Sequence, residues 1–212
     1  TPRSLVLGTV NLAAGGRIDA GTLSLSDTTT LSGGTLELVS SAAQAISAPG
    51  ADLADKQAVG LPLAYAADAV LQTGGSIDLA AGATLQVHAT QGGSVQLGRT
   101  GNRFLGSLQV LSGAAFGTGW VANATPGDFG KPAPNGYALQ SRVQVAGSTV
   151  VVGGLGIEAD VISLSADMLT TPSANSAVPT LTARLPFDNT VGTEVSQPGL
   201  TLALTDASFN LA

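Results

Sequence analysis

Short segments in which apolar and polar residues alternate recur along most of the chain, the pattern expected of β-strands with one buried face. No segment carries an apolar stripe of helical spacing for more than about three turns. Alternation divides the strand residues into an inward and an outward set. Inward residues include Ile18, Leu36, Ile77 and Val95, and outward residues include Asp19, Glu37, Asp78 and Gln96. We therefore predict an all-β fold.

A glycine pair precedes four of these segments, at 15–16, 33–34, 74–75 and 92–93. The step from Gly16 to Gly34 is 18 residues, and so is the step from Gly75 to Gly93. This period is too short for a propeller blade but suits one coil of a solenoid, with glycine supplying positive φ at the corners. The sequence predicts a right-handed parallel β-helix (solenoid) with about 18-residue coils and extruded loops. Residues 1–212 are interpreted as a single segment of a longer solenoid.

Three regions interrupt the strand pattern. Residues 42–69 fit a short helix or loop between two coils. Residues 113–137 contain three prolines and are interpreted as a loop extruded from the stack. Residues 171–199 contain four prolines, which a continuous central strand does not tolerate, so an irregular segment is expected there.

Composition narrows the function classes. Of the 212 residues, 44% are hydrophobic, 10% charged and 4% aromatic. Eight Lys and Arg against fourteen Asp and Glu give a net charge of -6, which offers no basic surface for nucleic acid. The chain has no cysteine, so neither a disulfide framework nor a Cys-ligated metal is expected. The chain contains no run of about 20 apolar residues, so the sequence predicts no transmembrane helix.

Few residues could carry chemistry. His88 is the only histidine and no Gly-Xaa-Ser-Xaa-Gly motif accompanies it, so we interpret it as an outward strand residue. Stacking of Asp19 on Glu37 one coil apart, and of Asp78 on Gln96, would form either an acid/base or Ca²⁺ site or a solvated polar ladder. Glu158 and Asp160 lie on the same side of a strand, where they would form either a cation site or part of a solvated outward face. Since no Lys or Arg falls at these coil positions, we favour the ladder, and expect no catalytic residue, metal ligand or cofactor.

The segment 113–137 is the preferred interaction candidate. It contains Phe116, Trp120, Phe129 and Tyr137, half of the eight aromatic residues of the chain. Loops on rigid scaffolds often bind partners, and aromatic side chains anchor interfaces. The alternative is that these side chains cover an open flank or end of the coil stack.

The glycine-led segments, such as Gly74–Leu79, and the stretches 157–167 and 182–192 resemble the rod region of filamentous haemagglutinin-like exoproteins. These are large Gram-negative proteins exported by two-partner secretion. The resemblance implies a secreted or outer cell-surface location, an outer-membrane transporter as export partner, and a role in adhesion. A host or bacterial surface receptor or a glycan would be the ligand.

Two functions follow as hypotheses. The first is a non-enzymatic structural and adhesive rod segment that presents loops to host or neighbouring cells. The second is a carbohydrate-active β-helix, either a polysaccharide lyase or hydrolase or a tailspike-like glycan binder. A groove holding three or more carboxylates would favour the second.

Overall fold

The computed structural model describes residues 3–42, 63–112, 138–151, 154–159, 161–166, 169–170, 180–183, 189–191, 201–204 and 209–211. The regular elements within these ranges are all β-strands. The predicted loop at 113–137, with its four aromatic residues, lies outside the described residues. None of the described elements is a helix long and apolar enough to cross a membrane.

The strands form three large sheets and one small sheet. Sheet A contains β1 (Ser4–Leu7), β4 (Thr22–Leu25), β8 (Asp68–Gln72), β11 (Ser94–Leu97), β15 (Arg142–Gly147), β18 (Val161–Ala166), β21 (Asn189–Val191) and β23 (Phe209–Leu211). Sheet B contains β2 (Val10–Leu12), β5 (Thr29–Leu31), β9 (Ile77–Leu79), β12 (Arg103–Phe104), β16 (Thr149–Val151) and β19 (Leu169–Thr170). Sheet C contains β3 (Gly15–Ala20), β6 (Thr35–Ser40), β10 (Thr84–Ala89), β13 (Ser107–Ser112), β17 (Leu155–Ala159), β20 (Thr180–Ala183) and β22 (Thr201–Leu204). The small sheet pairs β7 (Leu63–Tyr65) with β14 (Ala138–Gln140).

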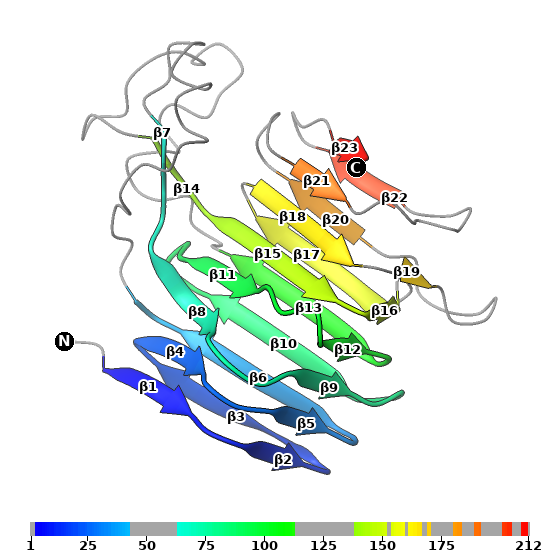
Figure 1. Cartoon of the computed structure of the whole chain (residues 1–212). Coiled ribbons are helices and arrows are strands. Elements are labelled where there is room, and N and C mark those ends of the chain that lie inside the picture. The colour runs from blue at the N-terminus through cyan, green and yellow to red at the C-terminus, as the bar shows by residue number, and fades with distance from the viewer. Residues whose placement is uncertain are drawn as a thin grey trace.

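The chain visits sheets A, B and C in turn, so that each strand lies parallel to the equivalent strand of the next coil (Figure 1). Three strands make one coil, and the described residues complete six such coils before β21, β22 and β23 extend sheets A and C. The predicted parallel β-helix is therefore confirmed. Within the proline-containing region 171–199, β20 and the strand at 189–191 take regular places in the stack.

Aliphatic side chains fill the interior in rows that run along the stack. One row in sheet A is almost fully buried because each side chain packs on its equivalent one coil away. Its members are Leu23, Val70, Val95, Val143 and Ile162. Phe104 is the aromatic residue among the largest fully buried side chains of the described core. The low aromatic content of the sequence fits this narrow interior.

The repeat length differs from the prediction. Ser4 pairs with Thr22 at the expected 18-residue step, but Gly16 pairs with Leu36 and Val70 pairs with Val95. Coil length varies because the corners differ in length. The glycine pairs are consequently not equivalent: 15–16 and 33–34 lie where sheet B gives way to sheet C, whereas 74–75 precede β9 and 92–93 precede β11. The predicted inward and outward sets are confirmed, but the predicted stacking is wrong.

Glycine is required at some corners for two reasons. Gly75 has a φ of +57°, a conformation that disfavours any Cβ. A Cβ at this position would also meet the backbone of Asp27 and Thr28 in the preceding coil. Close packing of coil on coil therefore adds to the conformational reason that the sequence suggested.

The chain carries two long insertions in sequence at one corner, between a strand of sheet C and the next strand of sheet A. One separates β6 from β8 and the other separates β13 from β15. In the coil between them, only Thr90–Gly93 connect β10 to β11, with Gly92 at a φ of +78°. β7 and β14, which precede the coils on either side of this turn, pair with each other (Figure 1). The prediction for 42–69 needs correction, because 63–65 and 68–69 are strand residues.

Ser94 joins the chain ends of the two insertions. Its hydroxyl donates to the Ala66 carbonyl at 2.7 Å and accepts from the Arg142 amide at 3.2 Å. Its own amide donates to the Ala67 carbonyl at 2.9 Å. A single buried side chain thus holds together three coils at the point where both insertions return to the stack.

Candidate functional site

The outer face of sheet C carries two parallel rows of side chains. Strand register places Gln86, Gln109 and Gly156 in one row. Two residues further along the same strands, His88, Leu111 and Glu158 form the other row. Since neighbouring strands lie about 4.8 Å apart and alternate residues about 6.7 Å apart, the rows enclose a strip that runs along the stack.

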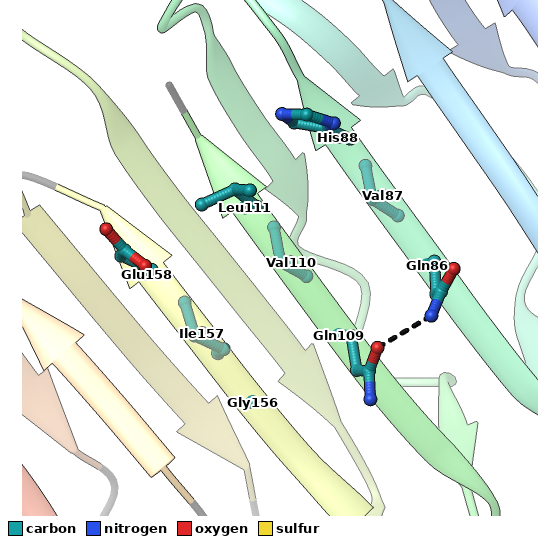
Figure 2. Close-up of a pocket in the computed structure, with 9 residues that line it drawn as sticks. All are labelled: Gln86, Val87, His88, Gln109, Val110, Leu111, Gly156, Ile157 and Glu158. Carbon is teal, nitrogen blue, oxygen red and sulfur yellow. Dashed lines mark hydrogen bonds between the residues drawn. The ribbon is translucent and has the colours of Figure 1, made fainter. Parts of the chain in front are cut away.

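A trough lies between these rows, on β10, β13 and β17. It is a hollow of about 430 Å³, open to solvent, whose floor is the strand segments at Val87, Val110 and Ile157. Figure 2 shows the two rows on either side of the floor. The row that contains Gln86 and Gln109, here called the amide row, has no side chain on β17 because Gly156 occupies that place.

Hydrogen bonding within the amide row is directional. Gln86 Nε2 donates to Gln109 Oε1 at 2.7 Å, as the dashed line in Figure 2 marks. The next place in the row is Gly156, which has no side chain that could accept from the Gln109 amide nitrogen. In the other row, the buried Nε2 of His88 has no hydrogen-bond partner among the described residues, and Leu111 lies opposite it in the register.

Towards the first coil the same face is charged. Arg17 donates to Glu37 at 2.7 Å and forms a salt bridge with Asp19 at 2.9 Å. The hydrogen bond from Arg17 lowers the pKa of the Asp19 carboxyl, and the two carboxylates raise the pKa of Arg17. All three groups are solvent-exposed, so these ion pairs contribute little to stability.

The expected stacking of carboxylates is wrong. Asp19 lies opposite Val39, and Glu37 lies opposite Arg17. Asp78 lies between Thr30 and Arg103, with 3.9 Å between Asp78 and the Arg103 guanidinium. The steps of 20 and 25 residues between these strands displace the pairs that an 18-residue step would align. Arginines therefore do occupy equivalent coil positions, contrary to expectation.

The other sequence candidates have separate outcomes. His88 lies on the outward side of β10, as predicted, and is partly buried. Glu158 is exposed on β17, while Asp160 and the four aromatic residues of 113–137 lie outside the described residues. In the ranges that the structure describes, no three His, Cys, Asp or Glu residues lie together as a metal site would require.

Asp68 is a half-buried carboxylate on the adjoining sheet A. Its Oδ1 accepts from Gln96 Nε2 at 2.6 Å. Burial raises the pKa of Asp68, although the Gln96 hydrogen bond and the charge of Arg142 oppose the shift. Because burial disfavours the charged form, the ionised Asp68 costs folding free energy at neutral pH.

We expect Asp68→Asn to increase the free energy of unfolding by about 0.5 kcal/mol at pH 7. When folding raises the pKa of a carboxyl group, ionisation of that group destabilises the folded state at pH values above the raised pKa. This cost disappears as the pH falls through the raised pKa towards the unfolded value. The gain in stability of Asp68→Asn should therefore vanish near pH 3. Urea denaturation at pH 7 and at pH 3 measures it.

Asp27→Asn is the opposite control, since hydrogen bonds from Thr9 and Thr28 lower the pKa of Asp27. It should destabilise at pH 7 and lose its effect at low pH; equal signs for the two variants would contradict the assignment.

The trough was not predicted from the sequence. Its polar residues were visible as outward strand positions, but their grouping depends on steps of 23 and 47 residues between the paired strands. Gly156 stood in a glycine-rich run with Gly153 and Gly154, and a residue without a side chain gives no indication of a ligand site. The signal that could have found the site is the pairing of outward positions two residues apart on three strands.

The fold and the trough together define a class: a parallel β-solenoid with an open, mixed polar and apolar trough on one outer face. No protein-family model, curated protein or solved structure matches the chain.

Proposed function

We propose that this chain is a non-enzymatic structural and adhesive segment of a large secreted or cell-surface exoprotein of the filamentous haemagglutinin type. Its coils would form the rod, and its insertions would contact host or neighbouring cells. One observation carries the proposal: the two long insertions of the described fold return to the stack side by side, through β7 and β14.

The solenoid suits a presenting role because each coil is stabilised mainly by its neighbours. The continuous aliphatic rows make the stack stiff and allow its length to grow by repetition. An insertion at a corner leaves the rows intact, because the inward residues on either side of it keep their register. Contact surfaces can thus be added without loss of the core.

Side-by-side insertions favour a shared contact surface. Separate loops on distant coils would each bind alone, whereas β7 and β14 bring two chain segments to one place. The sequence of one insertion includes Phe116, Trp120, Phe129 and Tyr137, and aromatic residues of this kind anchor interfaces. The proposed partner is a surface receptor or glycan.

Location and export rest on the sequence resemblance. It supports release through an outer-membrane transporter of a Gram-negative bacterium, with the rod outside the cell. The absence of cysteine is compatible with passage of an unfolded chain through a pore, where cross-links would hinder it.

The carbohydrate-active alternative receives support for binding and none for cleavage. The trough is a groove of the kind that ligands occupy, but Glu158 is the carboxylate among its described lining residues. Acid/base cleavage of a glycosidic bond ordinarily uses two carboxylic groups.

The proposal is tested by replacing 113–141 with Thr-Gln-Gly-Gly, a copy of the tight turn at Thr90–Gly93. The register aligns Ser112 with Ala89 and Val143 with Val95, so the copied turn should close the coil. We expect binding of the purified chain to epithelial and bacterial cells to fall at least tenfold, while circular dichroism retains its β signal. The matched variant replaces 41–67 in the same way.

Unchanged cell binding in both replacements would overturn the proposal. So would release of unsaturated or reducing sugar ends from a polysaccharide panel, because that shows an enzyme. Should a replacement not fold, a variant with Phe116, Trp120, Phe129 and Tyr137 changed to serine provides the same comparison with the chain length unaltered.

A further inference from the structure

The trough on sheet C has the features of a ligand site, and its described lining residues do not come from the insertions. Its amide wall consists of Gln86 and Gln109, and its opposite wall includes Leu111 and Glu158. The amide row stops at Gly156, where the outward position of β17 carries no side chain. Amide groups beside an aliphatic surface, in an open strip, suit a ligand with both hydroxyl groups and apolar faces.

The charge of the residues that line the trough argues against polyanionic ligands. No Lys or Arg is among the described lining residues, and Glu158 brings a negative charge. The nearest arginine in the amide row is Arg17, three strands from Gln109, and it is held by Asp19 and Glu37. The described lining therefore offers a polyanion no cation to bind, which favours a neutral ligand.

Spacing favours an extended polymer parallel to the stack. Successive coils place equivalent side chains about 4.8 Å apart, which is close to the rise of one unit in an extended β-linked hexose chain. Each sugar unit would then meet the next side chain of the same row. Planar amides pair well with neighbouring hydroxyls because one end donates and the other accepts.

We propose that this trough binds one strand of a neutral, extended polysaccharide, lying along the stack between the amide row and the His88–Leu111–Glu158 row. This assignment deepens the proposed adhesive function and rests on it only for its biological setting. The ligand hydroxyls would take the hydrogen-bonding capacity of Gln109 that Gly156 leaves unused. The Leu111 side chain would lie against the sugar faces.

The test is Gly156→Leu, which places a bulky side chain in the trough at a lining residue. Among the described atoms, a Cβ there would meet nothing closer than Gln109 Cγ at 3.9 Å. We expect cellohexaose or β-1,4-mannohexaose to bind the wild-type chain in calorimetry, and the affinity to fall at least tenfold in the variant. Gln109→Ala, which removes an amide without adding bulk, should lower it several-fold.

Two matched controls lie on other faces. Gly98→Leu places the same side chain after β11, where the nearest atoms belong to the Gln144 side chain at 3.7 Å. Gln144→Ala removes an outward amide from sheet A. Both should retain wild-type affinity.

Four results would overturn the proposal: no binding of any neutral hexasaccharide, equal affinity in Gly156→Leu and wild type, tighter binding of heparin hexasaccharide, or displacement of the sugar by an uncharged extended peptide. The insertion replacements separate this failure from failure of the adhesive function. Loss of cell binding in those replacements, with no sugar bound to the trough, would refute the trough alone.

Discussion

Replacing Asn102 with leucine will lower the free energy of unfolding by about 4 kcal/mol, because it leaves several buried polar groups without partners. Asn102 is fully buried at the corner between β11 and β12. Its Oδ1 accepts from Gln72 Nε2 and from the Ile77 amide, each at 2.8 Å. Its Nδ2 donates to Gln72 Oε1, to the Leu97 carbonyl and to the Ala146 carbonyl. Urea denaturation followed by circular dichroism measures the loss.

Two comparisons establish that the loss comes from unpaired groups. Asn11→Leu, at an exposed position of β2, should change stability by less than about 0.5 kcal/mol. The double variant Asn102→Leu/Gln72→Leu should be more stable than Asn102→Leu alone, since both paired amides are then removed together. A single-variant loss below about 1 kcal/mol would contradict the assigned network.

Gly75→Ala is expected to cost at least about 3 kcal/mol, through left-handed backbone strain together with a clash between coils. The new methyl group would meet the backbone of Asp27 and Thr28, which cannot move without displacing the preceding coil. Thermal and urea denaturation of the purified variant measure the cost, and failure to accumulate folded protein agrees with it.

Alanine substitutions at two other glycines distinguish the cost of left-handed backbone strain from the cost of the clash between coils. Gly82 also has a positive φ, +83°, but a Cβ there would meet no described atom within 4 Å. Gly82→Ala should therefore cost about 1 kcal/mol. Gly98 has neither a positive φ nor a close neighbour, so Gly98→Ala should be nearly neutral. Equal losses at Gly75 and Gly82 would show that coil contact adds nothing.

The fold class was predictable because alternation and glycine corners are local signals. Val95 and Gln96 show their inward and outward sides in the sequence alone, and the structure agrees. Register was not predictable, because it depends on corner lengths that no local signal specifies. Ile18 consequently packs in the row of Leu38, where an 18-residue step would give Leu36.

The polar interior was hidden for a related reason. Gln72 occupies a place in sheet A opposite Leu25, yet a glutamine in a strand is ordinarily interpreted as outward. Its burial is explained by Asn102, 30 residues away in the next coil. Likewise Gln86 and Gln109 became one site with Glu158 through three coils brought into register. These residues are brought together by the register between coils, so no single segment of the sequence shows that they belong to one group.

The parallel pairing of coil with coil has a mechanical consequence. Backbone hydrogen bonds between coils point along the stack, so tension applied to its ends loads these bonds in one coil junction at a time. The coils should then separate one after another, and the chain should lengthen greatly before the last pair of coils separates. The Asn102 network reaches Gln72, Leu97 and Ala146, which belong to three consecutive coils. Those coils should resist as one block, which would hold β8, β11 and β15 together while the other coils extend.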